Sequence, residues 1–304
     1  MIMAKFSSYL KSMRLRTLPL SLAGVLLGSL LAVADYRVPF VVILLVCLTT
    51  VCLQITSNLS NELGDVLHGT DGADRQGPQY GLNSGGMSIK EMKVLIGVFV
   101  GLSALGGLAM LWVSFGTLWC FESLVLVLLG LAAIVAAMRY TLGRNPYGYR
   151  AKGDFFVFIF FGLVSVLGSY YVCAHTLHSW LLLLPASTMG FFSIGVLNTN
   201  NMRDIKTDAP NRITVAIKLG PRKARVYQTA LIALGWACMV AYTLLRMADW
   251  RHWLFVLTLP LFVMHLRGVW THEDRGLDRY LPMLVMASFL FAILGGIGFT
   301  AYLW

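Results

Sequence analysis

Charged side chains are scarce in this chain of 304 residues. Asp, Glu, Lys and Arg together make up 12% of it, and only 14 residues are acidic. That is too little charge to cover the surface of a soluble domain. An apolar content of 58% and a mean hydropathy of +0.73 are instead typical of an integral membrane protein. The composition therefore excludes a soluble globular protein.

Side chains that form disulfides or soft-metal sites are also few. The five cysteines lie within or at the edges of apolar segments, and no pair has metal-ligand spacing. They are Cys47, Cys52, Cys120, Cys173 and Cys238. The six histidines are scattered, and no two are four residues apart on one helix. A disulfide framework and a cysteine or histidine metal centre are therefore excluded, and the cysteines are interpreted as packing residues.

A cleavage site for a leader peptide is missing as well. Lys5, Lys11, Arg14 and Arg16 precede the first apolar segment, but no small-residue cleavage site follows. We expect that segment to remain as a signal anchor. Most of these basic residues are interpreted as topology determinants, and Arg16 is the one that could also contact a substrate.

Long apolar runs are what the chain has in abundance. Nine of them reach or approach the ~20 residues that cross a bilayer as a helix. They are residues 17–34, 38–59, 92–115, 118–138, 155–174, 180–197, 226–245, 252–269 and 281–303. His265 and Arg267 shorten the eighth, so the prediction is eight to nine spans. No soluble domain remains between them, and we expect one transmembrane domain over residues 1–304.

The net charge of +10 has a topological explanation. If nine spans alternate across the membrane, all Lys and Arg except Arg37, Arg246 and Arg251 lie on the side of the amino terminus. The positive-inside rule then predicts a cytoplasmic amino terminus and an outside carboxy terminus. We expect a multi-pass protein of the cell (inner) membrane, with neither nucleic acid nor an obligate protein partner.

Six of the 14 acidic residues lie in two short segments, each directly after a long apolar run. The polar residues of these segments include Asn61, Glu62, Asp65, Asp71, Asp74, Arg75, Asn200, Asn201, Arg203, Asp204 and Asp208. Carboxylates at such positions are costly and tend to be functional. The Asn-x-x-x-Asp spacing occurs in both segments, which places these side chains on one helix face and suggests a parallel repeat.

Two facing clusters of carboxylates are typical of a divalent metal site that holds a polyphosphate. Mg²⁺ takes oxygen ligands, usually one or two carboxylates with water and substrate phosphates. The alternative is a solvated loop whose aspartates cap helices or pair with arginines. Duplication of the acids and the accompanying asparagines favour the metal site.

A third polar segment, residues 140–154, lies between the two acidic ones. By itself it reads as a positive-inside loop with interfacial tyrosines. Beside two acidic segments, Arg150 could bind a diphosphate through two parallel hydrogen bonds, and Tyr140 could donate another.

The chain resembles the UbiA superfamily of membrane prenyltransferases, which has Asn-x-x-x-Asp with a following Asp and Asp-x-x-x-Asp on two cytoplasmic loops. The resemblance is closest to the 1,4-dihydroxy-2-naphthoate prenyltransferases of menaquinone synthesis, in residues 16–19, 64–78, 146–150 and 200–208. Glu62 departs from the pattern, since many members have Asp there. The run after Asp208 is one residue shorter than usual, which leaves open whether Arg212 or Lys218 assists the diphosphate.

The resemblance implies an all-α membrane bundle around a central cavity, capped by cytoplasmic loops and open to lipid. It implies a Mg²⁺-dependent transfer of a polyprenyl group from polyprenyl diphosphate to 1,4-dihydroxy-2-naphthoate, with loss of carbon dioxide and diphosphate. Asp65, Asp71, Asp204 and Asp208 would bind the metal and, with Arg150, form the catalytic set. The substrate-binding residues implied are Asn61, Arg75, Tyr140, Tyr147, Asn200, Asn201 and Arg203.

Other functions remain open at this point. Within the same fold the acceptor could be 4-hydroxybenzoate, homogentisate, a haem or a chlorophyllide. From other classes, the chain could be a cation-coupled secondary transporter or a scaffold without catalysis. Coupling sites of transporters usually lie mid-membrane, whereas the acids here flank the spans, which favours the enzyme.

Overall fold

The computed structural model describes residues 2–69, 79–246 and 249–301, and the side chains from residue 6 onward. Asp71, Asp74 and Arg75, three of the predicted site residues, lie outside the described residues. The described chain is helical. The α-helices are α1 (Ile2–Met13), α2 (Leu18–Asp35), α3 (Phe40–Leu67), α4 (Ile89–Phe115), α5 (Phe121–Arg139), α6 (Gly153–Val157), α7 (Ser165–Ala174), α8 (Leu183–Arg203), α9 (Ile205–Asp208), α10 (Val215–Leu245), α11 (Leu259–Thr271) and α12 (Tyr280–Thr300). The shorter or irregular helical segments are η1 (Leu15–Thr17), η2 (Tyr147–Tyr149), η3 (Phe158–Val164), η4 (Trp180–Leu182), η5 (Trp250–Thr258) and η6 (Asp274–Leu277).

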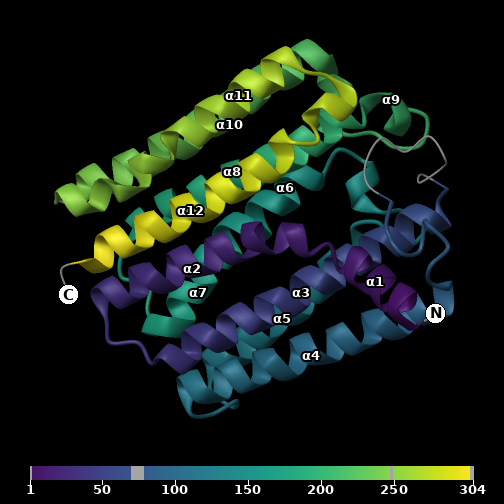
Figure 1. Cartoon of the computed structure of the whole chain (residues 1–304). Helices are drawn as coiled ribbons and strands as arrows, with labels where there is room; N and C mark the ends of the chain where they lie inside the picture. The colour runs from purple at the N-terminus through teal and green to yellow at the C-terminus, as the bar shows by residue number, and fades with distance from the viewer. Residues whose placement is uncertain (1, 70–78, 247–248, 302–304) are drawn as a thin grey trace.

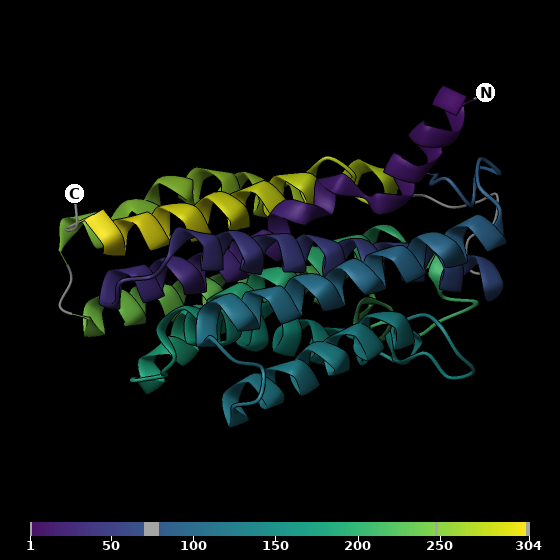
Figure 2. The same cartoon turned by 90° about the horizontal axis from the view of Figure 1, so that it is seen from below.

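Within these residues, nine helical segments are long and apolar enough to cross a membrane, which confirms the predicted multi-pass bundle. Helices α2, α8 and α12 lie in the middle, α10 and α11 cover one side, and α3, α4 and α5 cover the other (Figure 1). Helix α1 projects at an angle from one end of the bundle (Figure 2). That end also holds α9, whereas α12 finishes at the opposite end, as an odd number of crossings requires.

Several helices are longer than the apolar runs within them. The apolar run before the first acidic segment ends near Leu59, yet α3 continues to Leu67. Its 28 residues span ~42 Å, more than the ~30 Å of a bilayer core. The last turns of α3 therefore extend beyond the hydrocarbon, where polar side chains are not costly. Helix α10 likewise begins at Val215 and bends at Gly220, which has a φ of 73° and precedes Pro221.

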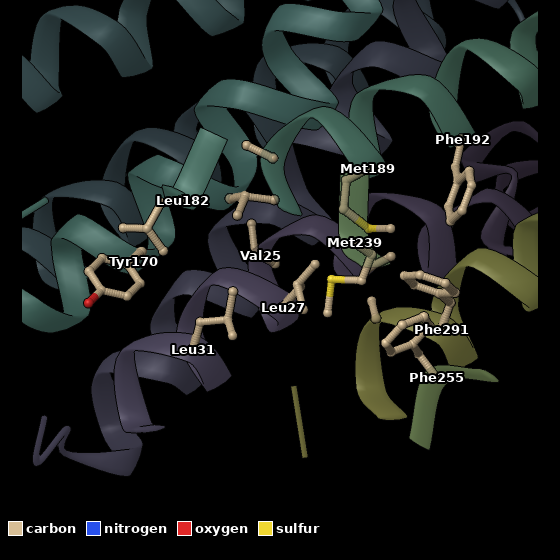
Figure 3. Packing of buried hydrophobic residues seen from close by; sticks show 14 of the residues in the cluster. Val25, Leu27, Leu31, Tyr170, Leu182, Met189, Phe192, Met239, Phe255 and Phe291 are labelled. Atoms are coloured by element: carbon tan, nitrogen blue, oxygen red, sulfur yellow. The ribbon is translucent and has the colours of Figure 1, made fainter. Parts of the chain in front are cut away.

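Small residues bring central helices close together. Gly24 and Gly28, one turn apart on α2, face α7 and η3, and a Cβ at Gly28 would lie 2.2 Å from the Val166 carbonyl oxygen. This spacing permits close backbone contact without a hydrophobic driving force between helices. Larger side chains fill the space beyond, where the rings of Phe192 and Phe255 pack against the ring of Phe291, on one side of Met239 (Figure 3).

The eighth span tolerates His265 because its polar atoms are paired inside the bundle. One ring nitrogen lies 3.0 Å from the Gln228 amide nitrogen and the other 2.9 Å from the Tyr280 carbonyl oxygen. A buried polar group with both partners satisfied is far less costly than an unpaired one. The span therefore forms in spite of the residue that weakened its hydropathy.

Candidate active site

A cavity of about 1400 Å³ runs through the bundle from the end that holds both acidic segments. Asn61, Asp65, Asn201 and Asp204 contribute to its polar end. The rest of the wall is mainly apolar, comes chiefly from α3, α4, α5, η3 and α7, and extends as far as Leu177. Ordinary small-molecule sites measure roughly 300–1000 Å³. This cavity therefore suits a long apolar ligand with a polar head.

The first acidic segment lies on the last turns of α3. Asn61 and Asp65 are one turn apart and both line the cavity. Asp65 is buried, and its Oδ1 accepts a hydrogen bond of 2.7 Å from the Tyr149 hydroxyl. Asn61 Oδ1 accepts one of 3.3 Å from Thr141 Oγ1. The segment between α5 and α6 therefore orients both side chains.

Gly64 permits this contact, because a Cβ there would lie 2.5 Å from the Thr141 Cβ and 2.7 Å from its carbonyl oxygen. We expect Gly64→Ala to lower the free energy of unfolding by about 1–3 kcal/mol through overpacking. Thermal unfolding of the purified protein measures this. Gly101→Ala on α4 is the matched control, since its added Cβ would meet no described atom of a neighbouring helix within 4 Å. Equal stability of the two variants would contradict the prediction.

The second acidic segment continues the helical spacing of α8 into α9. The Asp204 N–H donates to the Asn200 carbonyl at 3.2 Å, and the Asp208 N–H donates to the Asp204 carbonyl at 2.9 Å. Asn200, Asp204 and Asp208 therefore keep to one side, and all three line the cavity together with Asn201. Arg203 does not line the cavity. It is 3% exposed and donates two hydrogen bonds, of 2.8 and 2.6 Å, to the Asp204 carboxylate.

Arg212 connects the two acidic segments. Its Nη2 lies 2.6 Å from Asp208 Oδ2, and its Nη1 lies 3.8 Å from Asp65 Oδ1. Residues 149–151 pair with Ile213 through two backbone hydrogen bonds of 2.8 and 3.1 Å, which holds Arg212 at this place. A carboxylate from each segment therefore faces the same cationic group.

The third polar segment contributes tyrosines to the cavity wall. Tyr140 and Tyr147 both line it, as expected of substrate contacts. Burial raises the pKa of Tyr140 to about 12, so its hydroxyl stays protonated and can donate. The Tyr147 hydroxyl already donates to the Ala136 carbonyl at 2.7 Å. Arg150 is exposed, does not line the cavity and donates to the Asn145 side chain.

Arg14 was missed from the sequence as a site residue. The Arg14 guanidinium lies 3.9 Å above the Tyr80 ring, and Arg16 donates to the Tyr80 hydroxyl at 3.0 Å. All three residues line the cavity. Nε and Nη2 of Arg14 are buried without a hydrogen-bond partner among the described residues. Asn58, one turn before Asn61 on α3, donates to the Met13 carbonyl at 2.8 Å and so holds this arginine pair beside the first acidic segment.

The donor atoms at this end of the cavity fit a hard divalent cation. Asp65 and Asp208 offer carboxylates around a position that already holds positive charge from Arg212. No three His, Cys, Asp or Glu side chains gather closely enough to hold an ion by themselves in residues 2–69, 79–246 and 249–301. Mg²⁺ commonly takes one or two carboxylates and completes its shell with water and substrate phosphates. The residues therefore fit an ion that a substrate helps to bind.

The sequence is similar to proteins of known family. The model of the UbiA prenyltransferase family matches residues 21–287. The 1,4-dihydroxy-2-naphthoate octaprenyltransferase of Escherichia coli K12 is 39% identical over 282 residues, which covers 92% of this chain and 90% of that protein. The protein of the same name from Haemophilus influenzae is 37% identical over 302 residues, which covers 98% and 97%.

Solved structures share the fold at lower identity. The apo structure of a UbiA homologue from Aeropyrum pernix K1 has a TM-score of 0.69 at 16% identity, covering 95% of this chain and 97% of that one. A UbiA homologue from Archaeoglobus fulgidus, bound to DMAPP and Mg²⁺, has a TM-score of 0.61 at 16% identity, covering 97% and 99%. These likenesses establish the all-helical membrane fold.

Proposed function

This chain belongs to the UbiA prenyltransferase family, and from that premise we propose that it transfers a polyprenyl group to 1,4-dihydroxy-2-naphthoate. The donor is a polyprenyl diphosphate, and the leaving groups are diphosphate and carbon dioxide. The observation that supports this most directly is the cavity, whose acidic end continues into a long apolar channel. A diphosphate head and a hydrocarbon tail need these two environments side by side.

The acidic end would bind the donor's diphosphate through Mg²⁺. Asp65, Asp204 and Asp208 would hold the ion, together with Asp71 of the undescribed segment. When bound, the ion would neutralise charge on the leaving diphosphate. Asn61, Asn200, Asn201, Tyr140 and Tyr147 line the same end and would orient the head group, with Arg75 as a further contact from the undescribed segment. The Mg²⁺-bound homologue from Archaeoglobus fulgidus supports this proposal.

The chain's own residues would guide the reaction at the allylic carbon. The C–O bond of the donor breaks, and its electron pair leaves with diphosphate. Arg212, already between the two acidic segments, is placed to stabilise that charge. The ring carbon that carries the carboxylate then forms a C–C bond with the allylic carbon, while the apolar wall excludes water. Loss of carbon dioxide returns its bonding electrons to the ring. No oxidant takes part, so the product leaves as the diol, the reduced form of demethylmenaquinone.

The acceptor's carboxylate would be bound by Arg14. We expect Arg14→Gln to raise the KM for the naphthoate about 10- to 100-fold, since a hydrogen bond to a charged group contributes roughly 1.5–3 kcal/mol. The KM for the prenyl diphosphate should stay near that of the unsubstituted protein. Arg37→Gln, in the connection between α2 and α3 at the opposite end of the bundle, is the control. Equal rises for both substrates would contradict the assignment.

Metal affinity is expected to depend on Asp208. Burial raises the pKa of its carboxyl to about 6, against the opposing effect of the Arg212 guanidinium. Because a protonated carboxyl does not bind the ion, affinity should fall about tenfold per pH unit below about pH 6 and level off above it. Mn²⁺ titration across this range measures the effect. An affinity that is constant down to about pH 5 would contradict the role of Asp208.

The decisive experiment is an assay of purified protein with Mg²⁺, 1,4-dihydroxy-2-naphthoate and a labelled polyprenyl diphosphate. Prenylated, decarboxylated product that requires Mg²⁺ would support the proposal. Turnover only with 4-hydroxybenzoate or homogentisate would retain the mechanism and overturn the acceptor. Folded protein that releases no diphosphate with any acceptor would favour the transporter or the scaffold.

We also propose that residues 1–304 act as a single domain in the cell's inner membrane, with the acidic end of the cavity cytoplasmic. All Lys and Arg except Arg37, Arg246 and Arg251 then lie on the cytoplasmic side. Labelling of single cysteines placed at each end, from intact cells, tests this orientation.

A further inference from the structure

The connection between α11 and α12 presents three carboxylates to the neighbourhood of the second acidic segment. Glu273 pairs with Arg225 at 2.8 Å, Asp274 with Lys206 at 2.6 Å and Asp278 with Arg203 at 2.8 Å. The connection lies at the same end of the bundle as α9 (Figure 1). Three ion pairs therefore join one loop to the end of α8, to α9 and to α10.

These ion pairs differ in burial. The side chains of Lys206 and Asp274 are 70% and 38% exposed, and that of Glu273 is 66% exposed. Exposed pairs of this kind contribute little, because water and salt screen them. Arg203 is 3% exposed, so its charge must be compensated by fixed partners. Asp204 is one of them, and Asp278, whose side chain is 41% exposed, is the other.

Arg203 transmits the contact with Asp278 to the cavity. Its Nη1 donates to Asp278 Oδ1 at 2.8 Å, on the side away from the two bonds to Asp204. Its Nη2 also donates to the Asn200 side chain at 2.9 Å. The guanidinium group is planar and rigid. The hydrogen bond from its Nη1 to Asp278 therefore also sets the direction of Nε and Nη2, which orient Asp204 and Asn200.

We propose that Asp278 is a positioning residue for the metal site. It acts through Arg203 and holds the Asp204 carboxylate in the orientation that binds the ion, although Asp278 does not itself line the cavity. Partners in the outer shell of a metal site commonly change its affinity when they are removed. This inference rests on the proposed function, since it assigns Asp204 to the metal.

Direct Mn²⁺ binding in the presence of inorganic diphosphate, followed by electron paramagnetic resonance in purified protein, tests the proposal without relying on activity. Asp278→Asn removes one of the two charges that compensate Arg203 and weakens the contact that fixes its orientation, so Mn²⁺ affinity should weaken between about 10-fold and 100-fold. Asp278→Glu keeps the charge on a longer side chain and should fall between that variant and the unsubstituted protein. Asp274→Asn is the matched control on the same loop and should leave affinity unchanged. Thermal unfolding of each variant shows whether a change is specific to the site.

The outcomes separate the inference from the proposed function. Unchanged Mn²⁺ affinity in Asp278→Asn, or an equal loss in Asp274→Asn, overturns the inference and leaves the proposed function standing. If the unsubstituted protein binds no Mn²⁺ even with inorganic diphosphate present, the metal-dependent function and the inference both fail. If Asp278→Asn does not fold, Asp278→Glu is compared with Asp274→Glu, and equal affinities overturn the inference.

Discussion

Asp65→Asn is expected to lower turnover about 100- to 1000-fold, the range found when a group that stabilises transition-state charge is removed. The substitution keeps the shape of the side chain, and its amide oxygen can still accept from the Tyr149 hydroxyl. What it removes is one negative charge from the place where both acidic segments meet. The loss should therefore appear in the release of diphosphate and in Mn²⁺ binding rather than in folding.

The control for this prediction is Asp249→Asn at the opposite end of the bundle. Asp249 accepts from the Arg251 N–H at the start of η5, and Asn is an equally good residue at that position. Its turnover should match the unsubstituted protein. Full activity in Asp65→Asn, with the protein folded, would remove Asp65 from the site and leave the second segment to bind the diphosphate alone.

Arg212→Ala is expected to lower turnover and to make the metal-free protein less stable. In that variant Asp65 and Asp208 lose the cation that lies between them, and breaking a buried pair in this way costs about 3–5 kcal/mol. Added Mg²⁺ would replace the lost positive charge. Thermal unfolding should therefore show a larger stabilisation by Mg²⁺ in Arg212→Ala than in the unsubstituted protein.

Arg212→Lys separates charge from shape in the same experiment. Lysine restores one positive charge, but its single nitrogen cannot replace the two guanidinium nitrogens that face Asp65 and Asp208. Stability should therefore recover more than turnover does. If Mg²⁺ stabilises all three proteins equally, Arg212 does not occupy the space that the ion would take. That result would contradict the prediction.

The spans could be predicted from the sequence because each depends only on local apolar content. Their ends could not, because a helix continues past the apolar run while its backbone hydrogen bonds remain satisfied. Leu59 ends the run in α3, whereas the helix ends at Leu67. Helix α1 was not predicted, since its mixed apolar and basic residues do not make a span by themselves.

The candidate site followed from the sequence where spacing along one helix was enough. Asn61 with Asp65 and Asn200 with Asp204 repeat every turn, and all four line the cavity. Arginines were harder to assign, because their partners lie far away in the chain. Arg203 meets Asp278, 75 positions later, and no local pattern indicates that pair.

Helix α5 has a consequence for the choice of donor. Within its bounds only Ser123 is buried, so one layer of apolar side chains separates the cavity from the surrounding lipid. Lipid tails are about as apolar as leucine, so a methylene group gains little free energy by partitioning from the bilayer into the channel. Selection among prenyl tails would then depend on the supply of donors in the membrane, while recognition stays with the head group. Donors that differ only in the number of distal isoprene units should react at similar rates.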